Sequence, residues 1–236
     1  MVSIKTEKIV ATAKTALLMG GMMLLYGCGG PQNAVRIGHR KHVLCPVPAP
    51  AGGAAFLMGS LEISVAEYAA YLNENPPAKQ HPQIVCAPKG CRPSRGLDKH
   101  PAAHVSRTEA ENFCYWLSRK TGRTVRLPTA AEWEHAARGG INGSDYPWGW
   151  GSPSSNACFR AEGPVECGQY DPNPYGLHDM AGNVAEWCSD NAGSQLVALG
   201  GSWAERSEEL LRVDRCTLFP PDYSDADVGF RILVER

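Results

Sequence analysis

Apolar residues recur at helical spacing in three stretches of the chain. The pattern predicts a helix over 65–73 and two more that begin after Ser106 and Thr129, residue types that cap helix N-termini. Glu109 and Glu132 follow these caps by three residues, which completes a capping box at each start. The apolar positions expected to face a core are Val65, Tyr68, Ala69, Leu72, Ala110, Phe113, Cys114, Leu117, Trp133, Ala136 and Ala137.

Strand signals are short and widely separated. They fall at residues 56–59, 61–64, 196–199 and 230–234, where apolar and β-branched residues are concentrated. The segment 76–101 holds six prolines and is expected to be a loop. The chain is therefore predicted to hold two or three helices, a few short strands and a majority of loop.

The first 27 residues have the outline of a lipoprotein signal peptide. Three lysines give a positive start, an apolar run follows over 16–25, and the stretch closes on Leu-Tyr-Gly-Cys28. An apolar run of about ten residues is too short to span a bilayer, for which about 20 are needed. We expect lipidation at Cys28 and a lipid-anchored place in the cell envelope, at the outer membrane and facing the periplasm or the surface. An ordinary secretory peptide or a short anchor is the alternative.

Composition indicates one domain held away from the membrane. Residues 28–53 are rich in Gly, Pro and Ala and indicate a tether, which leaves a single domain over 54–236. Removal of residues 1–27, which hold three Lys and one Glu, takes the formal charge from −1 to −3. No basic stripe remains, so nucleic acid is not expected as a partner.

The nine cysteines favour disulfides over a metal site. Setting Cys28 aside leaves eight, an even number that suits pairing in an oxidising compartment. Cys86 with Cys91, and Cys158 with Cys167, are close enough in sequence to staple one loop each. A zinc site is disfavoured because no C-x-x-C occurs and the histidines are scattered.

Three motifs of this chain occur together in one known family. They are residues 173–190 (N-P-Y-G-L-H-D-M-A-G-N-V-A-E-W-C-S-D), residues 126–140 (R-L-P-T-A-A-E-W-E-H-A-A-R-G-G) and the closing Gly-Phe-Arg of 229–231. The chain resembles the formylglycine-generating enzyme family, also called the sulfatase-modifying-factor domain, over nearly all of its mature length. The resemblance implies an α+β, C-type-lectin-like fold that is loop-rich, with two or three helices and short antiparallel strands. It also implies a disulfide between Cys114 and a cysteine near the C-terminal turn, for which Cys216 is the nearest candidate.

The two reactive cysteines of that family have no counterpart here. In the family they follow a G-G-S-aromatic turn, the first after one residue and the second after four more. The turn is present at residues 200–203, but Glu205 and Leu210 stand at the two cysteine positions. The family's copper ion requires soft thiolate ligands. The resemblance therefore implies the fold without copper and without oxidase activity.

A calcium loop is a second feature that the resemblance implies. Family members bind the ion with one side-chain oxygen, two backbone carbonyls and a Glu, which correspond here to Asp179, Gly182, Val184 and Glu186. Mixed carboxylate and carbonyl oxygens suit a hard cation, so we expect structural calcium. The alternative is that Asp179 and Glu186 brace the loop by hydrogen bonds with no ion.

The segment from residue 203 to 227 is expected to face solvent where family enzymes bind substrate. It mixes arginines, aromatic residues and carboxylates, the usual anchors of a recognition surface, and we expect it to bind a protein or peptide. Variable proteins of diversity-generating retroelements share this fold and vary in the same stretch, which suggests a similar role. The candidate binding residues are Trp203, Glu205, Arg206, Arg212, Thr217, Leu218, Phe219, Tyr223, Asp225 and Asp227.

Two other functions stay open at this point. One is an enzyme of the sulfatase-modifying family with a remodelled site, in which Glu205 acts with Arg206 or Arg212. The other is a structural lipoprotein of a secretion or motility apparatus. The sequence by itself does not separate these three functions.

Overall fold

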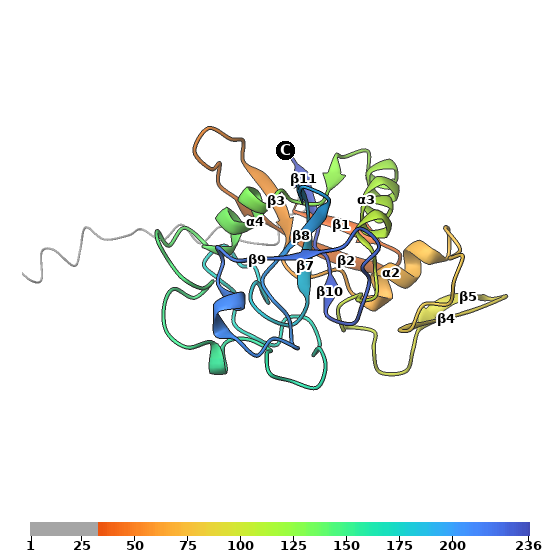
Figure 1. Ribbon diagram of the computed structural model, residues 1–236. Coiled ribbons are helices and arrows are strands. Elements are labelled where there is room, and N and C mark those ends of the chain that lie inside the picture. The colour runs from red at the N-terminus through yellow and green to blue at the C-terminus, as the bar shows by residue number, and fades with distance from the viewer. Residues whose placement is uncertain (1–32) are drawn as a thin grey trace, which may run out of the picture.

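The computed structural model describes residues 33–236 (Figure 1). The signal-peptide and lipidation predictions, Cys28 included, fall outside this range. The described part is α+β, with three α-helices, short strands and long loops, which confirms the predicted fold class. Within residues 33–236 no helix is both long enough and apolar enough to cross a membrane.

A five-stranded sheet forms one side of the domain. Its order is β1 (Ala34–Ile37), β2 (Arg40–Val47), β3 (Phe56–Gly59), β11 (Leu233–Glu235) and β6 (Val125–Arg126), and all its neighbours are antiparallel. Strand β11 comes last in the chain yet lies between β3 and β6. The sheet therefore joins the two ends of the domain.

The predicted tether is wrong over residues 34–47. These residues form the β1–β2 hairpin, and β2 pairs with β3 from Leu44 opposite Gly59 to Val47 opposite Phe56. Gly and Pro on either side of the hairpin dominated the composition and hid its apolar residues, among which Val35, Ile37 and Leu44 are buried. The folded domain thus begins about 20 residues before the predicted boundary at 54.

A second sheet holds four strands in the order β10 (Val228–Gly229), β7 (Ala185–Ala192), β8 (Gln195–Leu199) and β9 (Cys216–Phe219). The β10–β7 pair is parallel and the other two pairs are antiparallel. The sequence predicted β8 but not β7 or β9. The second half of β7 and the first residues of β9 are exposed or half-buried, and their polar side chains interrupt the apolar pattern. Of the remaining expected strands, 61–64 is irregular apart from an isolated bridge between Ser64 and Pro101, and 230–234 becomes β11 only from Leu233.

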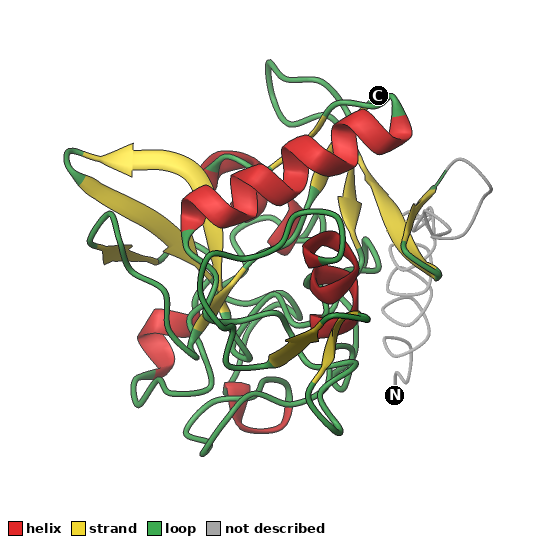
Figure 2. Cartoon of the chain, turned by 90° about the vertical axis from the view of Figure 1, so that its right-hand side faces the viewer, coloured by secondary structure: helices red, strands yellow, loops and turns green. Residues whose placement is uncertain are grey.

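All three predicted helices form, and each begins with a capping box. They are α2 (Val65–Leu72), α3 (Arg107–Thr121) and α4 (Ala130–Ala137), capped by Ser64, Ser106 and Thr129. Helix α3 ends at Gly122, whose φ of 67° is the left-handed conformation that glycine adopts without strain. Figure 2 shows α3 as the longest helix, lying along the outer side of the strands. The residues that the periodicity placed inward are buried, which confirms the predicted faces.

A small hairpin, β4 (Ile84–Ala87) with β5 (Gly90–Pro93), extends from the body beside α2 (Figure 1). The prediction of a plain loop over 76–101 is therefore wrong for these residues. Prolines lie before, between and at the end of the two strands, where a missing N–H breaks no strand pairing. They concealed the hairpin in the sequence.

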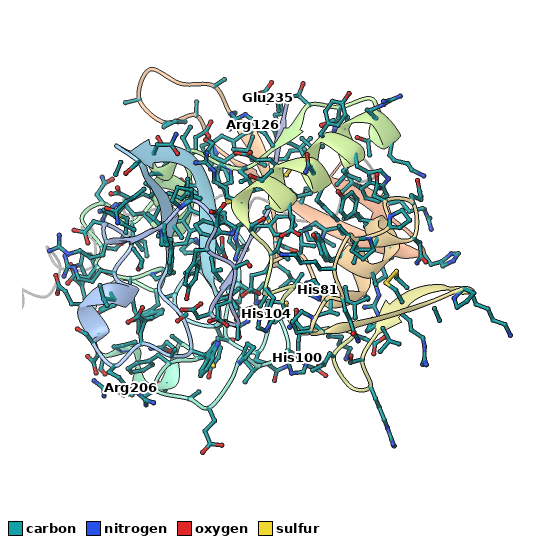
Figure 3. All side chains as sticks on the ribbon, turned by 45° about the vertical axis from the view of Figure 1, so that its right-hand side comes forward. His81, His100, His104, Arg126, Arg206 and Glu235 are labelled. Carbon is teal, nitrogen blue, oxygen red and sulfur yellow. A yellow bond between two sulfur atoms is a disulfide. The ribbon has the colours of Figure 1, made fainter. Side chains whose placement is uncertain are left out.

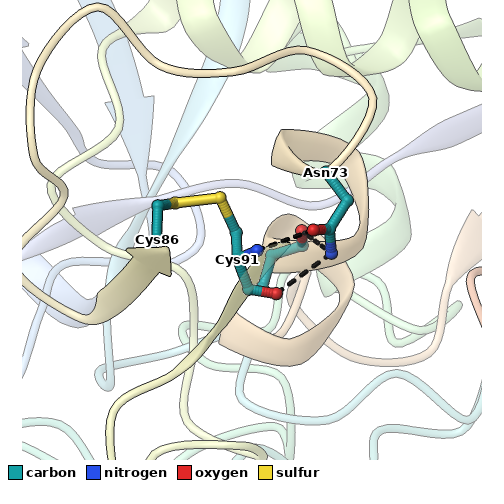
Figure 4. Close-up of a disulfide and its surroundings, with 4 residues drawn as sticks. Asn73, Cys86 and Cys91 are labelled. Atoms are coloured by element: carbon teal, nitrogen blue, oxygen red, sulfur yellow. Dashed lines mark hydrogen bonds between the residues drawn. A yellow bond between two sulfur atoms is a disulfide. The ribbon is translucent and has the colours of Figure 1, made fainter. Parts of the chain in front are cut away.

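The Cys86–Cys91 disulfide predicted from the spacing is present and joins β4 to β5 (Figure 4). Asn73, which follows α2, holds the hairpin through two hydrogen bonds with Cys91. Its amide donates to the Cys91 carbonyl oxygen at 3.0 Å, and its Oδ1 accepts from the Cys91 N–H at 2.6 Å. A disulfide that closes so short a loop contributes about 2 kcal/mol in the loop-entropy model.

The other predicted disulfides do not form. Cys114, Cys158, Cys167 and Cys216 are free thiols, as is Cys188. Cys114 lies on the buried face of α3, whereas Cys216 is exposed on β9, and both thiols are free. Cys158 directs its thiol to the Gly163 carbonyl at 3.8 Å instead of to Cys167. Buried thiols of this kind pack as small apolar side chains.

Candidate functional site

An ion pair between Glu186 and Arg231 lies at the centre of the domain. Both side chains are almost wholly buried, and Arg231 donates from Nε and Nη2 to the two carboxylate oxygens at 2.5 Å each. Trp133 of α4 adds an indole N–H to Oε2 at 2.6 Å. Burial alone would lower the pKa of Arg231, but the Glu186 carboxylate raises it, so the guanidinium stays charged.

Arg231 also connects segments that are remote in sequence. It donates to the Gly59 carbonyl at 3.0 Å and to the His178 carbonyl at 2.9 Å. One side chain thereby ties the end of β3, the loop before β7 and the start of β7 together. This role explains the arginine of the closing Gly-Phe-Arg motif.

Two further carboxyl groups surround the pair without cations of their own. Glu62 accepts from the Asn183 amide through Oε1 at 2.9 Å, and Asp179 accepts from the Gly168 N–H through Oδ2. Glu62 Oε2 and Asp179 Oδ1 are buried and have no hydrogen-bond partner among residues 33–236. Burial and then the neighbouring carboxylates raise the pKa of Glu62 well above its usual range, and burial raises that of Asp179.

The four predicted calcium residues line one loop, but they are not equivalent as ligands. Asp179 has a left-handed backbone (φ 56°) and an oxygen without a partner, which fits a hard cation. Glu186, in contrast, is already neutralised by Arg231 and bonded by Trp133. Gly182 and Val184 are the backbone positions between them, and the residues 33–236 hold no cluster of three or more His, Cys, Asp or Glu able to bind a metal.

The glycine turn at 200–203 adopts the conformation its sequence indicates. Gly200 and Gly201 have φ of 90° and 64°, and a Cβ added at Gly201 would lie 2.7 Å from the Leu210 carbonyl oxygen. Glu205 is half-buried beyond the turn, where burial and then the charge of Asp227 raise its pKa. Leu210 lies in a short 3-10 helix, Glu208–Leu211. These two positions therefore present a carboxyl group and an apolar side chain.

The predicted recognition surface divides into buried and exposed members. Phe219 is buried against Trp187, at a ring-centroid distance of 5.3 Å, and Tyr223 stacks on it at 4.3 Å. The Tyr223 hydroxyl donates to Asp227 at 2.9 Å, and the Trp203 indole donates to the Ala226 carbonyl at 3.0 Å. Phe219 is thus part of the core and not a free anchor, which corrects its predicted role.

Arg212 is likewise committed within the chain. Its guanidinium lies 2.8 Å from Asp145 and 3.1 Å from Asp214. Such an arginine is not available to assist Glu205, and the remodelled-enzyme hypothesis loses one of its two cations. Arg206, Leu218 and Asp225 are exposed, and Thr217 is half-buried. Figure 3 shows Arg206 at the lower left edge of the molecule, away from His81, His100 and His104, which lie near the centre of the view.

Sequence comparison places this fold and site in one family. The model of the sulfatase-modifying factor enzyme 1-like domain matches residues 11–236. The chain belongs to this family. Glu186 and Arg231, the central ion pair, belong to two of the motifs that carry the resemblance to this family, residues 173–190 and residues 229–231.

Curated relatives of the sulfatase-modifying-factor family differ in activity. The serine/threonine-protein kinase pkn1 of Chlamydia pneumoniae is 44% identical over 95 residues, 40% of this chain and 14% of that protein. The formylglycine-generating enzyme of Streptomyces coelicolor is 33% identical, over 61% of this chain and 56% of the enzyme. The inactive C-alpha-formylglycine-generating enzyme 2 of Mus musculus is 35% identical, over 56% of this chain and 48% of its own. The chain thus spans about half the length of the two latter relatives.

A solved structure shares the fold at greater sequence distance. Treponema denticola variable protein 1 superposes with a TM-score of 0.69 at 22% identity, over 86% of this chain and 98% of that protein. At this identity the likeness concerns the fold.

Sequence reasoning missed Glu62, although it lies beside the predicted calcium loop. Its segment was expected to be a strand, so the side chain was not assigned to any site. The signal that could have found it is the acidic residue inside an apolar run, Leu61-Glu62-Ile63, because a buried charge requires a partner.

Proposed function

We propose that this protein is an exported, lipid-anchored binding protein without oxidase activity. The observation that carries the proposal is the pair of residues at the family's cysteine positions, Glu205 and Leu210, neither of which supplies the soft thiolate that the family's copper site requires. A relative named as inactive has a comparable sequence identity, which supports a non-catalytic role. The proposed ligand is a protein or peptide. Because the fold is shared with a Treponema denticola variable protein, the proposal includes variation of the C-terminal segment by a retroelement.

The exposed part of the C-terminal surface supports the binding role. Leu218 is a large apolar side chain that is 40% exposed on β9, the edge strand of its sheet. Arg206 and Asp225 provide charges of both signs on exposed loops near the turn. An edge strand with an apolar residue between charges suits an extended peptide, which adds to the sheet by main-chain hydrogen bonds.

Site-specific crosslinking in the producing cell tests this surface. A photoreactive residue at Leu218 is expected to give a discrete adduct, because this side chain faces the bound partner. The matched control places the same residue at Tyr115, which is 66% exposed on α3, a helix outside the C-terminal segment. Arg206→Glu should lower the adduct yield at 218 severalfold, since an anchor contributes about 2 kcal/mol. Equal adducts at both positions, or adducts only at 115, would place the interface elsewhere.

We also propose that Asp179 binds calcium together with the carbonyl groups of Gly182 and Val184. Its buried, partnerless Oδ1 supports this, and a bound cation would offset the charge that Asp179 shares with Glu62 and Glu186. Glu186, held by Arg231, would complete the charge around the loop.

Calcium should therefore raise the melting temperature of protein first treated with a chelator. At a concentration 100 times the dissociation constant the stabilisation is about 2.7 kcal/mol. Asp179→Asn removes the ligand charge and should abolish the increase, whereas Asp171→Asn, at an exposed position, should preserve it. If calcium stabilises Asp179→Asn as much as the parent protein, Asp179 is not a ligand.

A further inference from the structure

The β4–β5 hairpin stands out from the body of the domain (Figure 1). It is held by the Cys86–Cys91 disulfide and by the hydrogen bonds of Asn73, and a cavity of about 570 Å³ is lined by the hairpin together with residues 76–81. A two-stranded hairpin alone is marginally stable. These links therefore hold it in one position while most of its residues stay exposed or half-buried.

The hairpin and its flanks carry positive charge without any carboxylate. Residues 75–97 hold four Lys or Arg and no Asp or Glu, in a chain whose formal charge is −1. All four are exposed, and within residues 33–236 none makes an ion pair or a side-chain hydrogen bond: Lys79, Lys89, Arg92 and Arg95. Arg126 and Arg215, by contrast, pair with carboxylates of this chain. The charge of the hairpin is therefore available to an external anion.

Strand pairing places an apolar residue and a cation on the same outer face of the hairpin. Val85 lies opposite Arg92 in the β4–β5 register, so the two side chains leave the hairpin on one side. Ile84, on the other side, is buried, which shows that the Val85 side faces away from the core. Val85 is 40% exposed, and the exposed Pro88 and Lys89 form the turn beyond it. The outer face and the tip thus combine small apolar side chains with positive charge.

This combination suits a phospholipid surface better than a protein partner. Stable protein interfaces bury about 800 Å² on each partner and are enriched in aromatic anchors, whereas residues 84–93 contain no aromatic residue. An anionic bilayer requires neither. Cations bind its headgroups from outside, and small apolar side chains enter the boundary between headgroups and acyl chains. A projecting hairpin can also reach a flat surface while the body of the domain stays away from it.

We propose that the β4–β5 hairpin binds the surface of an anionic phospholipid bilayer. Lys89 and Arg92 contact headgroup phosphates, while Val85 and Pro88 enter the headgroup layer. Each cation near such a surface strengthens binding about fivefold. The hairpin shares no residue with the C-terminal surface, so the proposal goes beyond the proposed function and has only a location at a membrane in common with it. For a domain on a lipid anchor, this second contact fixes which side faces the membrane.

An environment-sensitive fluorescent amino acid in place of Val85 tests the proposal in the purified full-length protein. Its emission should shift to the blue with phosphatidylcholine vesicles that contain about one third phosphatidylglycerol, and not with phosphatidylcholine alone, because the cations require anionic headgroups. The shift should be lost in about 1 M salt, where the Debye length is about 3 Å. The matched control carries the same residue at Leu218, which is also 40% exposed, and should show no shift. Because the signal is local to the hairpin, it does not depend on a lipid anchor.

Two double variants of the protein with the probe at position 85 locate the contact. At the salt concentration that halves the shift of the parent protein, Lys89→Ala with Arg92→Ala should reduce the remaining shift about tenfold, because two cations at about fivefold each are lost. Arg215→Ala with Arg236→Ala removes the same charge from exposed positions outside the hairpin and should leave the shift unchanged.

Four results would overturn the proposal. They are no shift with anionic vesicles, an equal shift with phosphatidylcholine alone, a shift as large at Leu218, and no difference between the two double variants. A shift with poly-L-glutamate but not with anionic vesicles would overturn it in favour of an acidic protein partner.

Discussion

Replacement of Arg231 by Met should lower the free energy of unfolding by about 3–5 kcal/mol, the usual result of breaking a buried ion pair from one side. Glu186 would lose both of its guanidinium hydrogen bonds and stay buried as an unmatched carboxylate beside Glu62 and Asp179. The carbonyl groups of Gly59 and His178 would each lose a donor as well. Urea denaturation followed by tryptophan fluorescence measures the loss.

Arg126→Met is the matched control for this change. Arg126 also binds two carboxylates, Glu132 at 2.7 Å and Glu235 at 2.8 Å, but its side chain is 35% exposed (Figure 3). An exposed pair contributes about 1 kcal/mol or less, because water replaces the lost partner. If both variants lower the free energy of unfolding by the same amount, burial does not make the Arg231 pair more important for stability than the exposed Arg126 pairs.

Gly182→Ala should destabilise the domain by at least about 3 kcal/mol, since it combines an unfavourable backbone with a clash. Gly182 has φ of 76°, and an added Cβ would lie 2.3 Å from the Cys158 carbonyl oxygen. Neither side can move freely, because Asn183 donates its N–H to that same oxygen at 2.8 Å and Gly182 donates to Gly200. Thermal unfolding of the two proteins side by side measures the effect.

Gly143→Ala separates the backbone cost from the clash. Its φ of 71° is nearly the same, but nothing lies within 4 Å of the added Cβ. Only the left-handed conformation is then unfavourable, at about 1–2 kcal/mol. A loss for Gly182→Ala no larger than for Gly143→Ala would mean that the loop before β7 can shift to accept a side chain.

The three helices could be predicted from local signals in the sequence. Ser64, Ser106 and Thr129 each place a hydroxyl and, three residues on, a Glu within reach of the first turn, so these starts are set by neighbours in the chain. The Cys86–Cys91 disulfide was equally local. Strands β1, β7 and β9 were missed because their partners lie elsewhere in the chain and their outward residues are polar.

The candidate site was predictable only in part for the same reason. The motif positions Glu186 and Arg231 were recognised, but their mutual ion pair depends on β11 and β7 being brought together by the fold. Phe219 looked like a surface anchor because its neighbours are polar, yet its ring is covered by Trp187 and Tyr223. Glu62 gained its importance from Asp179, more than a hundred residues away.

The position of β11 in its sheet limits how early the domain can finish folding. Among the strands of residues 33–236, β11 is synthesised last, and it pairs with both β3 and β6. Arg231, just before them, is the cation for Glu186. Until this segment leaves the ribosome, the sheet is split and the central carboxylate has no counter-ion. The five-stranded sheet can therefore close only after residues 231–235 have joined it, however early its other strands are made.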